Sequence, residues 1–70
     1  MCLATVYVDM GDGQKEEVMQ DVAFIEFKRQ GFLLTTILGE EKAFPAGSKV
    51  RNIDLLNGSM VIDESESSNP

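Results

Sequence analysis

Apolar and polar residues alternate along this chain in short runs rather than recurring at helical spacing. The first run, 2–10, has small or apolar residues at its even positions and carries Thr5 and Asp9 at odd positions. Because successive side chains of a strand point to opposite faces, this alternation predicts a half-buried strand. The one stretch with a helical period, 16–25, overlaps a β-branched and aromatic run at 22–27, which favours a strand instead.

Turn sequences separate these runs about every eight to twelve residues, which is typical of a small barrel or sandwich. Glycine supplies the positive φ that such turns need, and Asn-Gly is a strong hairpin signal. The turns are Gly11-Asp12-Gly13, Gln30-Gly31, Gly39-Glu40, Pro45-Ala46-Gly47 and Asn57-Gly58. They delimit about seven short strands, at 2–10, 14–19, 21–29, 32–38, 41–44, 50–55 and 59–63. We therefore expect one all-β domain over residues 1–63.

Two of these segments and the tail have a more specific interpretation. The polar segment 14–19 is expected to be an exposed edge or ribbon, and 32–38, apolar on both faces, a central strand. The tail 64–70 is acidic and Ser-rich and has no apolar residue, so we expect it to be disordered.

Seventy residues supply only a small core, and such chains usually need a disulfide, a metal or a partner subunit. Cys2 is the only cysteine and there is no histidine, so an intrachain disulfide and the familiar zinc fingers are excluded. Oligomerisation is therefore the expected source of additional stability.

The formal charge of −6 argues against nucleic acid as a partner, because phosphates are bound by lysine and arginine. No apolar stretch is long enough to span a membrane, and the chain starts without the basic segment of a secretory signal. A lone cysteine fits a reducing compartment. We expect a cytoplasmic protein.

The residues needed for catalysis are scarce. There is no histidine for proton transfer and no base to activate Cys2 as a nucleophile. Gly11-Asp12-Gly13 lacks the third glycine and the strand-to-helix context of a dinucleotide loop, and is interpreted as a hairpin turn. We expect that the chain is not an enzyme.

Cys2 is the candidate metal ligand. If Met1 is removed, Cys2 offers a thiolate, an α-amine and the next amide nitrogen, donors that suit square-planar Ni(II) or Cu(II). Two copies of Cys2 meeting across a dimer axis would complete four donors. The competing interpretation, which the residues alone favour, is a small apolar side chain at the start of a strand. Methionine thioethers are a further option for a soft metal, although core filling is the commoner role of Met1, Met10, Met19 and Met60.

The opening Met1-Cys2-Leu3-Ala4 resembles that of the CooT family, small nickel-binding accessory proteins associated with carbon monoxide dehydrogenase maturation. Three later segments carry the resemblance further: 21–25, 35–40 and 53–58. The resemblance implies a compact Sm-like β-barrel, a homodimer, and one Ni(II) held between subunits by the cysteine that corresponds to Cys2. It also implies a nickel enzyme as client. Because the chain has no histidine cluster, delivery or sensing of a single ion fits better than storage.

Two other functions stay open at this stage. The domain could be a protein-interaction module without metal, adding a partner strand at an exposed edge such as 16–20. It could also bind single-stranded RNA with Tyr7, Phe32 or Phe44 as stacking platforms, although its charge opposes this.

Overall fold

The computed structural model describes residues 3–11 and 13–63, and within these ranges every regular element is a strand. The strands are β1 (Ala4–Asp9), β2 (Lys15–Lys28), β3 (Gly31–Thr36), β4 (Glu41–Phe44), β5 (Lys49–Asp54) and β6 (Ser59–Asp63). This confirms the expected all-β class. None of the described segments is a helix of the kind that could cross a membrane. The cytoplasmic location stays a prediction, and the tail 64–70 lies outside the described residues.

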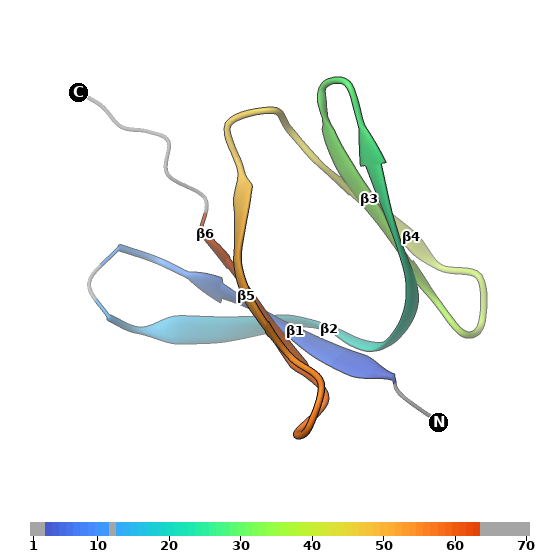
Figure 1. Ribbon diagram of the computed structural model, residues 1–70, viewed down its shortest axis with the longest axis horizontal. Coiled ribbons are helices and arrows are strands. Elements are labelled where there is room, and N and C mark those ends of the chain that lie inside the picture. Colours follow the sequence, from blue (N-terminus) through green and yellow to red (C-terminus); the bar gives the residue numbers. More distant parts are fainter. Residues whose placement is uncertain (1–2, 12, 64–70) are drawn as a thin grey trace.

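The six strands form one sheet with the order β4-β3-β2-β1-β6-β5. Neighbours are antiparallel except β1 and β6, which run parallel. The sheet is strongly curled but open, with β4 and β5 as its two edges (Figure 1). The expected closed barrel is therefore wrong. Turn spacing could not reveal this, because closure depends on the tilt and stagger of the strands, which bring the first and last strands together.

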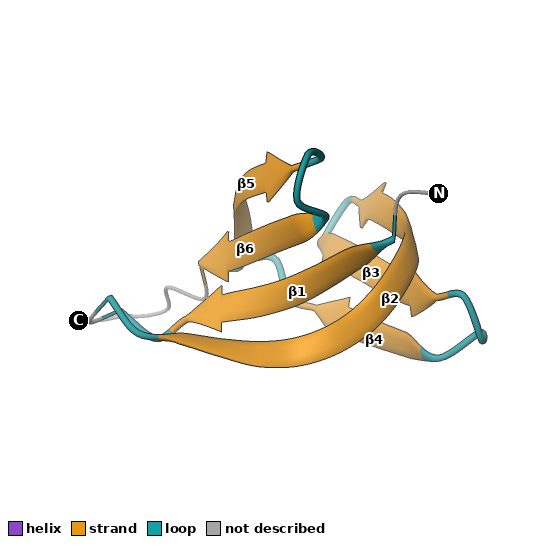
Figure 2. Cartoon of the chain, turned by 90° about the horizontal axis from the view of Figure 1, so that it is seen from below, coloured by secondary structure: helices purple, strands orange, loops and turns teal. Residues whose placement is uncertain are grey.

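The strand count also differs from expectation, because 14–19 and 21–29 belong to a single strand, β2 (Figure 2). Its register shifts twice against β1 and once against β3, and Asp21 has a left-handed φ of 58°. Each shift is a β-bulge, and bulges bend and twist a strand without ending it. The polar Gln20-Asp21 boundary is thus a bend, where β2 passes from pairing with β1 to pairing with β3.

The core lies on the concave face of the curled sheet. Val6 and Val8 of β1, Leu34 of β3, and Met60 and Ile62 of β6 are at most 4% exposed. The rings of Phe32 and Phe44 stack with centroids 5.1 Å apart. Only alternate residues of β3 are buried, so it is half-buried and lies next to an edge rather than at the centre of the sheet.

The β2–β3 turn shows why glycine is required there. Gly31 has a φ of +101°, and a Cβ at this position would collide with the backbone carbonyl oxygen of Phe44. A larger residue would push β4 away from β3 and strain the backbone at the same time. The turn signal at Gln30-Gly31 is therefore also a packing requirement.

Candidate metal centre and the surfaces around it

Cys2, the predicted metal ligand, lies outside the described residues, so the structure shows its surroundings only from Leu3 onward. β1 begins at Ala4, which pairs with Val22 of β2. On the other side, the Thr5 amide donates to the carbonyl of Gly58 over 2.8 Å. The start of β1 therefore lies between β2 and the β5–β6 turn.

The β5–β6 turn is held by one aspartate. The amides of Leu56 and Asn57 each donate to Asp54 Oδ1 over 3.1 Å, and the Asn57 side chain donates to Oδ2 over 2.8 Å. The Gly58 amide donates to the Asp54 carbonyl over 2.8 Å. The hydrogen bonds to the carboxylate lower the pKa of Asp54 because they stabilise its charged form. The side chain of Asn57 contributes most, followed by the backbone amides of Asn57 and Leu56. The turn is thus a preformed structure.

This turn exposes two leucines, which we call the apolar tip: Leu55, 75% exposed, and Leu56, 93% exposed. Residues 55–62 include no charged side chain. The turn that carries the tip contacts the start of β1 through its last residue, because a Cβ on Gly58 would lie 2.8 Å from the carbonyl oxygen of Leu3. Two exposed leucines, beside the Asp54 carboxylate that holds their turn, therefore belong to the same turn as the contact with Leu3.

The described residues do not complete a metal site by themselves. Among residues 3–11 and 13–63, no three histidine, cysteine, aspartate or glutamate side chains are arranged to hold an ion. Met60 is fully buried and Met19 packs against the core, which confirms core filling for both. Met10 is 58% exposed, so core filling is wrong there, and Met1 lies outside the described residues.

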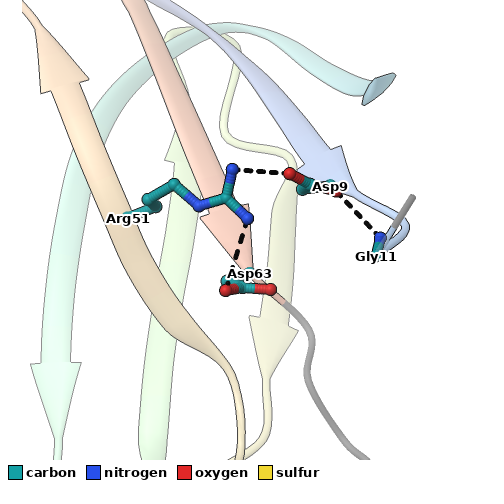
Figure 3. A network of polar contacts seen from close by, with 4 residues as sticks. All are labelled: Asp9, Gly11, Arg51 and Asp63. Carbon is teal, nitrogen blue, oxygen red and sulfur yellow. Dashed lines mark hydrogen bonds and ion pairs between the residues drawn. The ribbon is translucent and has the colours of Figure 1, made fainter. Parts of the chain in front are cut away.

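A polar network lies at the opposite end of β1 (Figure 3). Arg51 of β5 contacts Asp9 over 2.5 Å and Asp63 over 3.4 Å, and Asp9 also accepts the Gly11 amide over 2.8 Å. The register of β5 against β6 shifts between Val50 and Asn52, so Arg51 is the bulged residue, and bulges commonly redirect a side chain.

This network is structural. Asp9 and Asp63 are direct neighbours on the parallel strands β1 and β6, and Arg51 neutralises the pair. The Gly11 amide, and then the Arg51 guanidinium, lower the pKa of Asp9, while the two carboxylates raise the pKa of Arg51. The sequence did not suggest this cluster, because its three residues lie on separate strands.

The aromatic residues suggested as RNA-stacking platforms do not form one. Phe32 and Phe44 are 5% and 3% exposed and stack on each other in the core, and Tyr7 is half-buried. Phe32 and Phe44 thus belong to the buried face of the sheet and not to a binding surface. This removes the structural argument for the RNA alternative.

The comparisons with known proteins agree with the resemblance found in the sequence. The family model described as CO dehydrogenase accessory protein CooT matches residues 1–63. The crystal structure of a protein from Carboxydothermus hydrogenoformans, named there as a CooT, shares the fold with a TM-score of 0.80. That protein is 22% identical, and the match covers 93% of this chain and all of the other.

No curated protein matches the chain. The family match covers nearly the whole chain and concerns an accessory protein, which confirms the expectation that the chain is not itself an enzyme. The chain belongs to the CooT family of CO dehydrogenase accessory proteins.

Proposed function

We propose that this protein binds Ni(II) and delivers or senses it for a nickel enzyme such as CO dehydrogenase. One ion is held between two copies of the chain by the Cys2 of each. The observation that supports this best is the apolar tip, Leu55 and Leu56, which is exposed in the turn that contacts the start of β1 through Gly58.

The donors explain the choice of metal. Each copy contributes the Cys2 thiolate and a nearby backbone or amino nitrogen, and two copies give four donors in a plane. Thiolates and nitrogens in a square-planar arrangement favour Ni(II) over Zn(II), which prefers a tetrahedron. Binding releases the thiol proton, so nickel affinity falls as the pH drops below the thiol pKa.

The apolar tip gives a physical reason for the two copies to meet at this end. A chain of net charge −6 repels its own copy over most of its surface. Residues 55–62 carry no charged side chain, and the one adjacent carboxylate, Asp54, is turned to the Leu56 and Asn57 amides, so apolar burial of the two leucines meets little like charge. Packing of the Leu55 and Leu56 side chains between copies would bring the two chain starts toward each other.

The test is a nickel titration of untagged protein, followed by optical absorption and by native mass spectrometry. We expect thiolate-to-nickel charge-transfer bands that saturate at one ion per two chains. Mass spectrometry also shows whether Met1 is removed, and retention of Met1 should weaken binding because the Cys2 amine is then lost as a donor.

Cys2→Ser is the decisive variant, and we expect it to lose the bands and the bound ion. The matched control is Met10→Leu, which removes an exposed sulfur elsewhere and should leave the titration unchanged. If Cys2→Ser retained nickel as tightly as the parent, the proposal would be wrong.

A further inference from the structure

A second surface lies on the other side of the β2 bend. It is a groove of about 390 Å³ between residues 17–21 of β2 and residues 36–38 and 40, at the end of β3 and in the β3–β4 turn. We call it the acidic groove. The turn that forms one wall is closed by hydrogen bonds from the Thr36 amide to the Glu40 carbonyl and from the Glu40 amide to Thr36 Oγ1.

One wall of the acidic groove is an open strand edge. On one side, β1 pairs with β2 from Lys15 to Val22. On the other side, β3 pairs with β2 only from Val22 onward, and the Ile37 amide adds one further bond, to the Asp21 carbonyl over 2.9 Å. Along 15–20, no strand within the described residues pairs with this second edge. Such an edge can accept an additional strand.

The charges lining the groove are all negative. Glu17, Asp21 and Glu40 line it, and no lysine or arginine does. The ion pairs found among the described residues involve none of these three carboxylates. Glu17 accepts a hydrogen bond from the side-chain amide of Gln20, an exposed contact that leaves the charge of Glu17 uncompensated.

Apolar side chains complete the surface. Ile37 is 51% exposed and Leu38 is 86% exposed, at the turn where the sequence predicted the end of a strand. Val18 and Met19 of β2 are half-buried in the opposite wall. The groove therefore offers apolar contact next to negative charge.

We infer that the acidic groove docks an extended, positively charged segment of a partner protein, which adds as a strand to the open edge of β2. Its backbone pairs with residues 15–20, an apolar side chain packs on Leu38, and its lysine or arginine residues face Glu17, Asp21 and Glu40. Charge selects this occupant, because a second copy of this acidic chain, or a nucleic acid, would bring negative charge to negative charge. The inference does not depend on nickel binding.

The test uses the full chain labelled with ¹⁵N, without nickel, and a capped seven-residue peptide in which arginine and leucine alternate. We expect the largest amide shifts in 15–21 and 36–40. The same peptide with glutamate in place of arginine should produce none. Cys2→Ser should bind the arginine peptide as the parent does, which separates this result from any failure of the nickel proposal.

Three variants measure the separate contributions. Glu17→Gln combined with Glu40→Gln should weaken peptide binding about tenfold, at two- to fivefold for each exposed charge pair. The matched control Glu26→Gln removes the same kind of exposed charge outside the groove and should change binding less than twofold. Leu38→Ser should weaken binding about tenfold at constant charge, because it removes the apolar contact.

Three results would overturn the inference. They are no shifts in 15–21 at low salt, equal weakening by Glu26→Gln and Glu40→Gln, or shifts of the same amides by magnesium alone with exclusion of the peptide. The first shows that the edge accepts no strand, the second that the net charge alone attracts the peptide, and the third that the groove is a cation site.

Discussion

The apolar tip and the acidic groove expose leucine to a similar degree but differ in what surrounds it. Leu56 is 93% exposed beside one carboxylate, Asp54, which accepts its amide. Leu38 is 86% exposed in a groove lined by three carboxylates, none of them in an ion pair found among the described residues. On a chain of net charge −6, the first environment permits contact with another copy and the second opposes it. Exposure of a leucine alone therefore does not identify the partner, because the neighbouring charges decide which partner fits.

Both surfaces are held in shape before any partner arrives. Asp54 fixes the apolar tip through the Leu56 and Asn57 amides, and Thr36 closes the turn beside the acidic groove through both its amide and its hydroxyl. A preformed turn loses little conformational entropy on binding, which favours association. The two surfaces should therefore respond to substitutions independently.

The largest effect is expected from Leu55→Ser combined with Leu56→Ser. Four leucine side chains would leave the interface between two copies, and even half of their full burial energy corresponds to a loss of dimer affinity on the order of a thousandfold. Sedimentation equilibrium measures the affinity, and nickel retention should fall with it. Leu38→Ser, the matched change in the acidic groove, should leave the dimer intact. Equal effects of the two changes would show that charge does not distinguish these surfaces.

A smaller effect, on the free energy of unfolding, is expected from alanine substitutions at two glycines. These are Gly58 beside the apolar tip and Gly39 beside the acidic groove. Both have positive φ, +70° and +92°, so alanine at either position costs about 1 kcal/mol in backbone strain. A Cβ at Gly58 would also lie 2.8 Å from the Leu3 carbonyl, whereas at Gly39 it would meet nothing within 4 Å.

We therefore expect Gly58→Ala to lower the free energy of unfolding by about 2 kcal/mol and Gly39→Ala by about 1 kcal/mol. Urea denaturation measures both. Only Gly58→Ala should also weaken nickel binding, because it displaces the start of β1. Identical losses would mean that the contact with Leu3 does not constrain the chain start.

Ionic strength should affect binding at the two surfaces differently, by several-fold in affinity. Raising the salt from about 50 mM to about 500 mM shortens the range of electrostatic attraction, so binding of the arginine peptide to the acidic groove should weaken. Association through the apolar tip should hold or strengthen, because screening reduces repulsion between two acidic chains. Titrations at both salt concentrations test this, and a parallel response of the two interactions would contradict it.

The smallest effect is expected in acid. Hydrogen bonds hold the pKa values of Asp9 and Asp54 below the ordinary value of 3.8 in the folded chain. The folded state therefore gains stability from both carboxylates above this pH, and loses it as the pH falls through their folded pKa values. Thermal unfolding should show a decline that begins below about pH 4, and Asp54→Asn should make the decline shallower. A decline of unchanged steepness in Asp54→Asn would assign the acid sensitivity to Asp9.

Much of the fold could be predicted from local pattern. The alternation in 2–10 marked Val6 and Val8 as the buried face of β1, and the five turn sequences all fall between or beside strands. These features depend on neighbouring residues only, since side-chain period and the φ of glycine are local properties. The opening Met1-Cys2 and the later segments also identified the family, and Cys2 as a nickel ligand stays a prediction.

What the sequence by itself determined is therefore the strand pattern, the turns and the family. Only the tertiary structure decided that the sheet is open, that 14–19 and 21–29 are one bent strand, and that Ile37 and Leu38 are exposed in a turn. The same holds for the Arg51 network and the acidic groove, whose residues come from separate segments. The physical reason is that closure, bulges and clustered charges depend on how distant strands pair, and no local pattern records that pairing.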